Sequence, residues 1–274
     1  HRRFKDGNAR DRLAAHVMFV IGHYPASPYA SAAANMYLFS GVDGAVLYEP
    51  ARKAWLAAVA AQPADGNILL NAASFLELED RATSEKLLKQ GMGAEPKNPA
   101  WHERLGQLYL RQTLVAEDAG AKYASASKAL QELERASALM PTEDERLQIM
   151  GELVKSSYMV DRTDKTTDYA TRWLKEVPVG RWDYANAQHY GHTALGLIAL
   201  KAKDVKGAAA HLAQSADHAG SPQLNSFGPC MDLAAALLAR GERDAVADYF
   251  EACGKFWKAG AKNLAEWTTT VKAG

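Results

Sequence analysis

Four histidines in the C-terminal half of the chain have types and spacings that could bind a metal: His189, His192, His211 and His218. His189 and His192 are three residues apart, so a helix places them on one face, and the other two fall on the segment expected to pair with that helix. Zinc or another divalent metal can use such a set. No His-Glu-x-x-His pattern and no carboxylate at a motif spacing completes a site. We therefore expect histidines that pack or face solvent and no metal cofactor, with metal binding as the alternative.

The two cysteines, Cys230 and Cys253, allow a second kind of chemistry. Cys230 precedes one expected helix and Cys253 lies near the end of its partner, and antiparallel pairing brings those ends together, so a disulfide is geometrically conceivable. We expect buried free thiols, with the bridge as the alternative. No histidine stands at a spacing that suggests a cysteine nucleophile.

The remaining residues carry no catalytic signature. The sequence contains no phosphate-binding loop, dinucleotide fingerprint, nucleophile elbow or deaminase-type zinc motif. Carboxylates gather at expected turns and helix starts, and those after Pro141 and Thr142 favour a helix dipole and a capping role over acid–base catalysis. We expect no enzymatic activity and no cofactor.

A recurring spacing predicts the elements that position these residues. The frame is a small residue, a large apolar residue four later, a small residue three later and a proline five after that. Complete copies are Ala51-Trp55-Ala58-Pro63, Ser84-Leu88-Gly91-Pro96 and Ala129-Leu133-Ala136-Pro141, and partial copies begin at Thr166 and Ala208. A period of roughly 34 to 45 residues is typical of stacked helical hairpins, in which small residues let helices cross closely. The frame predicts an all-α fold.

The expected organisation is a single domain over residues 1–274. A helical cap covers 1–44, five to six hairpins cover 45–258, and a C-terminal cap or tail covers 259–274. An apolar content of 48% is enough for a sizeable core.

Two segments carry a family resemblance, Leu105-Gly106-x-x-Tyr109 and Leu195-Gly196-x-x-Ala199, each followed by a small-x3-large step. The pattern resembles the tetratricopeptide repeat over about residues 45–258. The resemblance implies a right-handed superhelix of antiparallel helical hairpins, an α-solenoid, whose concave face binds a peptide or a partner protein. The pattern departs at Thr166 to Trp173, where a tryptophan takes a small-residue slot, and we expect altered packing of that hairpin.

The C-terminal region has a second resemblance. The stretch from Ser221 to Leu233 and the aromatic residues after it resemble a group of bacterial tetratricopeptide-like proteins that has no assigned function. Members of that group tend to have asparagine where Cys230 stands. The resemblance implies a bacterial origin and offers no chemistry.

Residues 220–229 interrupt the repeat. The segment is rich in glycine, proline, serine and asparagine, which predicts an ordered loop, with Pro229 opening the next helix. We expect Leu224 and Phe227 to pin this loop into the core. The alternative is a contact site for a ligand or peptide that uses Asn225 and Phe227, because binding residues concentrate on loops held by rigid scaffolds.

Charge and hydropathy restrict the partners. The chain has 32 basic and 32 acidic residues, so no long-range field favours nucleic acid or an anionic membrane surface. The longest apolar run, Val17 to Ile21, is too short for a membrane span. We expect a protein or peptide partner, with no nucleic acid and no membrane span.

The inner helices of the hairpins are expected to line the concave face. Counting around those helices from the packing side predicts a mixed groove of Leu69, Leu70, Ala73, Glu77, Glu103, Arg104, Gln107, Arg111, Tyr190, Leu197 and Lys201. Arg104 and Arg111 could form a local anion site there. Trp182, in an expected turn, is a further candidate for surface recognition.

The leading hypothesis is a non-catalytic scaffold that holds a peptide or partner protein in this groove. The competing hypothesis is a small-molecule-binding protein or an enzyme whose site lies at residues 221–231 with Trp182, His189 and Tyr190. A third is a structural segment of a longer polypeptide, because the chain starts at His1 and not at methionine.

Overall fold

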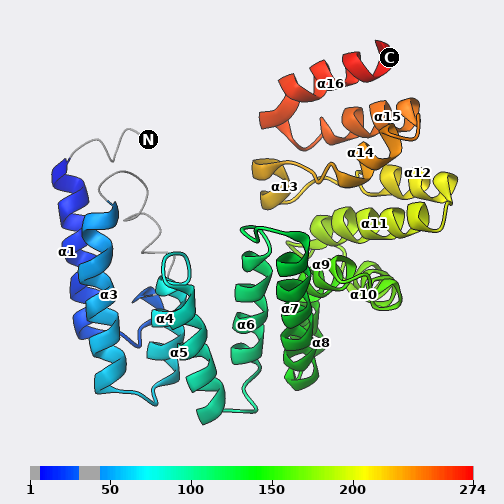
Figure 1. Ribbon diagram of the computed structural model, residues 1–274. Coiled ribbons are helices and arrows are strands. Elements are labelled where there is room, and N and C mark those ends of the chain that lie inside the picture. Colours follow the sequence, from blue (N-terminus) through cyan, green and yellow to red (C-terminus); the bar gives the residue numbers. More distant parts are fainter. Residues whose placement is uncertain (1–6, 31–43, 274) are drawn as a thin grey trace. The chain divides into compact units, whose positions relative to one another are not determined.

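The computed structural model describes residues 7–30 and 44–273, and within these ranges the regular secondary structure is entirely helical (Figure 1). The predicted all-α class is confirmed for this part of the chain. The chain divides into two compact units, His1–Leu108 and Tyr109–Gly274. The boundary falls within α6 (Pro99–Gln112). A single domain and a continuous superhelix stay predictions.

The described residues of the first unit form, besides the start of α6, the elements α1 (Gly7–His23), η1 (Pro28–Ala30, a 3₁₀ turn), α3 (Gly44–Ala61), α4 (Gly66–Leu76) and α5 (Arg81–Ala94). Helix α3 packs against α1 and α4, and α4 packs against α5. Residues 1–6 and 31–43 of the predicted N-terminal cap lie outside the described residues.

The second unit begins with the last turn of α6. Its helices are α7 (Ala119–Leu139), α8 (Glu143–Gln148), α9 (Met150–Met159), α10 (Thr163–Glu176), α11 (Tyr184–Lys201), α12 (Val205–Gln214), α13 (Pro222–Phe227), α14 (Asp232–Leu238), α15 (Arg243–Cys253), η2 (Lys258–Gly260) and α16 (Ala261–Ala273). Successive helices fold back on one another, as α9 does with α10 and α11 with α12. Helix α11 also packs against α9 and α14, an arrangement compatible with a helical repeat.

Side-chain caps mark several of the helix starts. Asp65 and Asp80 accept hydrogen bonds from the first backbone N–H groups of α4 and α5, which have no partner within the helix. Thr142 and Glu145 form a reciprocal capping box at α8. The predicted capping role of the residues after Pro141 is therefore confirmed.

The residues of the recurrent frame form the helix crossings. Ala129, Leu133 and Ala136 are completely buried on α7, as the frame predicts. In the first unit the close approach is extreme at Gly91, where an added Cβ would lie 2.3 Å from the indole of Trp101. The ring occupies the space that any larger side chain would need.

The irregular fourth copy of the frame is accommodated by a glycine on the neighbouring helix. Trp173 is buried, and its indole lies over Gly151 of α9, where a Cβ would come within 2.9 Å. Thr166 is also buried, and its hydroxyl bonds to Ser157 Oγ at 3.0 Å. The large residue of this crossing therefore lies in the slot on α10 that is usually small, and the small residue that faces it is the glycine on α9.

Two glycines on α5 provide a matched test of this packing. We expect Gly91→Ala to lower the free energy of unfolding by about 1 to 3 kcal/mol because the new methyl group overpacks against Trp101. Gly93 has no neighbouring atom within 4 Å of an added Cβ, so Gly93→Ala should raise stability by about 0.5 to 1 kcal/mol through helix propensity. Urea unfolding of both variants measures the difference, and equal effects would contradict the close crossing.

Candidate functional site

Three of the predicted groove residues of the first unit are joined by hydrogen bonds. Arg104 donates to Ser74 Oγ on α4 and to Gln107 Oε1, the latter at 3.3 Å. Gln107 donates to Glu103 Oε1 at 3.2 Å. Burial raises the pKa of Glu103, opposed by the charge of Arg104 and the bond from Gln107. The sequence correctly placed these side chains together on one helix.

The prediction for the preceding helix is wrong in part. Leu69 and Ala73 are buried, because α4 packs against α3 on one side and α5 on another and has few free positions. Leu70 is half-buried, and so is Glu77, which ends α4. The prediction assumed the wrong helical phase for α4 and therefore assigned core residues to its solvent-facing side.

Arg111 and Lys201 belong to the second unit, and both interact with other residues of that unit. Burial lowers the pKa of Arg111, while the charge of Glu152 opposes this shift. Lys201 bonds to Asp161 Oδ1 at 2.6 Å, and its Nζ lies 4.4 Å from the ring centroid of Tyr158. An anion site shared by Arg104 and Arg111 stays a prediction, since the two residues lie in different units.

The predicted loop over residues 220–229 contains a helix, α13, and the sequence interpretation is wrong on this point. Ser221 Oγ accepts a hydrogen bond from the backbone N–H of Leu224 at 3.1 Å, and Pro222 occupies the first turn, where no N–H is needed. Helix α14 starts at Asp232, so Pro229 does not open it.

A buried polar network fixes α13 to α11. Ser221 Oγ donates to Asn186 Oδ1 at 2.6 Å, and Asn186 Nδ2 donates to Gln223 Oε1 at 2.6 Å. The side chain of Asn225 covers Gly220, whose φ of +91° and tight surroundings both favour glycine. Asn225 therefore supports the turn before α13 as well as facing solvent.

The two apolar residues of α13 have opposite environments. Leu224 is completely buried, as predicted, whereas Phe227 is 84% exposed and does not anchor the segment. The next residue, Gly228, has a φ of +86° and packs against Trp257, where a Cβ would lie 2.6 Å from the ring. The backbone on both sides of Phe227 is held while its side chain points to solvent.

His189 connects this segment to the hairpin of α11 and α12. Its Nδ1 lies 2.8 Å from Ser215 O and must donate, because a carbonyl can only accept. Its Nε2 accepts the backbone N–H of Cys230 at 2.8 Å. His218 is placed similarly, with Nε2 3.0 Å from Ser215 O and Nδ1 accepting the N–H of Gly220. These bonds require both rings to be neutral.

The other two histidines pair with each other. The Nδ1 atoms of His192 and His211 lie 3.0 Å apart. Burial, followed by the effect of His211, lowers the pKa of His192 to about 4. Among residues 7–30 and 44–273, no three His, Cys, Asp or Glu side chains form a group that could hold a metal ion. The histidines serve hydrogen bonding and packing between α11 and α12.

Two other predicted site residues of the second unit, Tyr190 and Trp182, also have exposed aromatic side chains. Tyr190 is 38% exposed, beside the buried His189 ring at a centroid distance of 4.9 Å. Trp182 is 65% exposed in a turn that Arg181 fixes through ion pairs with Asp144 at 2.6 Å and Asp183 at 2.8 Å. Each exposed ring therefore stands on ordered backbone.

Cys230 and Cys253 are free thiols, so no disulfide joins them. Burial raises the pKa of Cys230 to about 11 and that of Cys253 to about 12. Both groups are protonated at neutral pH and are poor nucleophiles.

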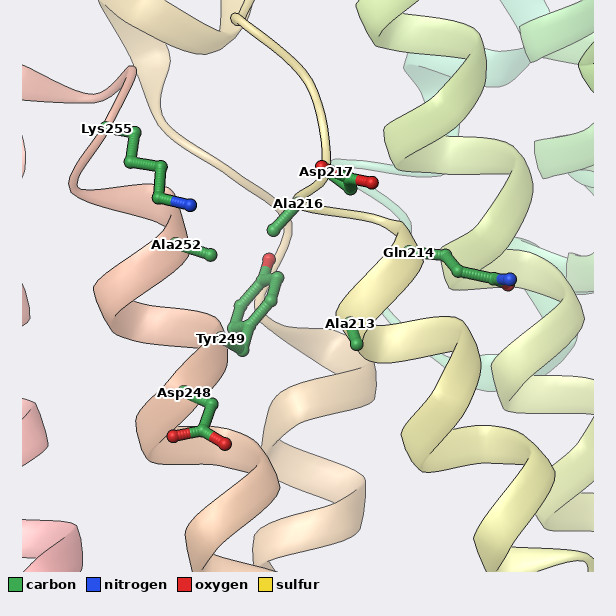
Figure 2. A pocket seen from close by; sticks show the side chains of 8 residues that line it. All are labelled: Ala213, Gln214, Ala216, Asp217, Asp248, Tyr249, Ala252 and Lys255. Atoms are coloured by element: carbon green, nitrogen blue, oxygen red, sulfur yellow. The ribbon is translucent and has the colours of Figure 1, made fainter.

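A pocket that sequence analysis did not predict lies between α12 and α15 (Figure 2). Its volume is about 360 Å³, and it is open to solvent. The lining residues are Ala213, Gln214, Ala216, Asp217, Asp248, Tyr249, Ala252 and Lys255. The only sequence signal is a set of alanines, which in a helical repeat indicates close packing and not a space.

No model of a known protein family matches the chain, and no curated protein matches it. In the described part of the chain, no helix has the length and apolar character needed to cross a bilayer.

The neutral state of His189 predicts acid sensitivity. Burial lowers its pKa from 6.5 to about 4, so below pH 6.5 the unfolded chain takes up a proton that the folded protein resists. This residue should remove about 2 kcal/mol of stability between pH 7.5 and 4.5. Urea unfolding at both pH values should show a smaller pH effect in His189→Gln than in the wild type. His16→Gln, on the exposed side of α1, is the control, and an unchanged pH effect in His189→Gln would contradict the assignment.

The opposite environments of Leu224 and Phe227 predict opposite effects on folding. Leu224→Ala should lower the free energy of unfolding by about 2 to 4 kcal/mol, as for a buried leucine. Phe227→Ala should change it by less than about 0.5 kcal/mol. Similar losses in the two variants, measured by urea unfolding, would show that Phe227 packs in solution.

Proposed function

We propose that the protein is a non-catalytic scaffold of the tetratricopeptide-like class that binds a peptide or partner protein through Phe227 of α13 and Tyr190 of the hairpin helix α11. The observation that carries this proposal is Phe227, an 84% exposed aromatic side chain on a backbone held at both ends. Large aromatic residues dominate the binding energy of protein interfaces. A ring whose backbone is already ordered loses little conformational entropy when a partner covers it.

The surroundings of Phe227 support this role. The segment ends in the bond from Cys230 N–H to His189, and the next residue of α11, Tyr190, presents a second partly exposed ring. Burial, followed by the effect of Cys230, raises the pKa of Tyr190, so its hydroxyl stays neutral and can donate a hydrogen bond.

The same geometry disfavours an enzyme at residues 221–231. Both ring nitrogens of His189 are occupied by backbone groups, so the residue is not available as a general base. The thiol of Cys230, with a pKa of about 11, is not activated as a nucleophile. A surface that recognises a partner fits these groups better than one that transforms a substrate.

Selection from a random peptide display library tests the proposal. Peptides enriched on the wild type should share a sequence motif and bind Phe227→Ala at least about tenfold more weakly. Tyr190→Ala should weaken the same peptides. Tyr123→Ala, which removes a 54% exposed tyrosine from α7, is the matched control and should bind normally. Selected peptides that bind Phe227→Ala as well as the wild type would overturn the proposal.

A further inference from the structure

The pocket between α12 and α15 has the composition of a small-ligand site. Three alanines, Ala213, Ala216 and Ala252, give it short apolar walls, and Tyr249 lies between them (Figure 2). A space of about 360 Å³ is far larger than ordinary packing gaps and lies at the lower end of small-molecule sites.

Tyr249 makes the inner wall rigid. It is 1% exposed, and its hydroxyl donates to Cys230 O at 2.8 Å, which ties α15 to the segment before α14. The alanine side chains have no rotamers to rearrange. The pocket is therefore formed before any ligand arrives.

Three charged side chains stand around the pocket without salt bridges in the described part of the chain: Asp217, Asp248 and Lys255. The ammonium group of Lys255 points over Ala252, and Asp217 stands at the same end of the pocket, on the segment after α12 (Figure 2). Asp248 lies at the other end. Lys272 bonds to Glu251 at 2.8 Å, and the more distant charge of Asp248 also contributes to raising the pKa of Lys272.

The positions of these three charges indicate which charged groups a ligand of this pocket would carry. Lys255 complements a carboxylate, and Asp217 at the same end of the pocket complements an ammonium group, the pair that every free α-amino acid carries (Figure 2). Asp248 lies on α15 at the other end of the pocket from Lys255, which follows the end of that helix, so Asp248 complements a cation at the end of a long side chain (Figure 2). The alanines contact the aliphatic part between them.

We propose that this pocket binds a free basic α-amino acid. The α-carboxylate pairs with Lys255, the α-ammonium pairs with Asp217, the side-chain methylenes cover Ala216 and Ala252, and the terminal cation pairs with Asp248. The ligand carries two positive charges and one negative charge, against two negative and one positive in the pocket.

Calorimetric titration with three compounds tests each contact. L-Arginine should bind saturably below about 10 mM. L-Citrulline, of the same shape but neutral at the side-chain end, should bind about tenfold more weakly. Agmatine, which lacks the carboxylate, should be weakened similarly. Equal affinity for L-arginine and L-citrulline, or no saturable binding of L-arginine, would overturn the proposal.

Variants assign the charges. Asp248→Asn should weaken L-arginine about tenfold and leave L-citrulline unchanged, so that the two compounds become equal. Lys255→Gln should weaken both compounds and leave agmatine unchanged. Asp244→Asn, on the same helix outside the pocket, is the matched control. A loss of L-arginine binding in Asp244→Asn as large as that in Asp248→Asn would show a general charge effect and refute the site.

Discussion

The helix packing depends on one constraint: large side chains lie directly against glycines, which have no Cβ. Trp101 covers Gly91 in the first unit, and in the second unit Trp173 covers Gly151, Leu233 covers Gly196 and Trp257 covers Gly260. Each contact sets how near two elements can approach, and dispersion forces fall steeply when such contacts loosen. Trp173 and Trp257 even leave their buried indole N–H groups without a partner among the described residues, a cost of about 1 to 3 kcal/mol each. At these two positions, the favourable packing of the indole ring outweighs the cost of the missing hydrogen bond to its N–H group.

The polar network of the second unit uses the positions that these crossings establish. Ser215 O receives bonds from both His189 and His218, and these rings in turn accept backbone N–H groups from Cys230 and Gly220. The carbonyl at the end of α12 thereby connects to both ends of the α13 segment. Displacing one helix would leave several buried polar groups unsatisfied together, and this couples the order of α13 to that of the hairpin beneath it.

The parts that could be predicted are those that depend on local pattern. The positions of the small residues in the frame predicted buried crossings, and Ala129 to Ala136 confirm them. Leu69 and Ala73 were misplaced because a buried helix is apolar on several sides, which makes its phase ambiguous. Helix α13 was missed because a capping serine, a first-turn proline and a final glycine leave few residues between them to show helical periodicity. The pocket could not be predicted, because it is the space that the side chains of α12 and α15 leave unfilled, and no single segment of the sequence determines that space.

Leu224 and Phe227 contribute differently to folding, and this difference affects how the sequence can change in evolution. One side chain secures α13, and the other takes no part in the core. Since stability limits which substitutions a lineage tolerates, a position without a folding role is open to change. Residue 227 can therefore acquire a new side chain without a compensating mutation elsewhere. The same property makes it a suitable attachment point for an engineered recognition group.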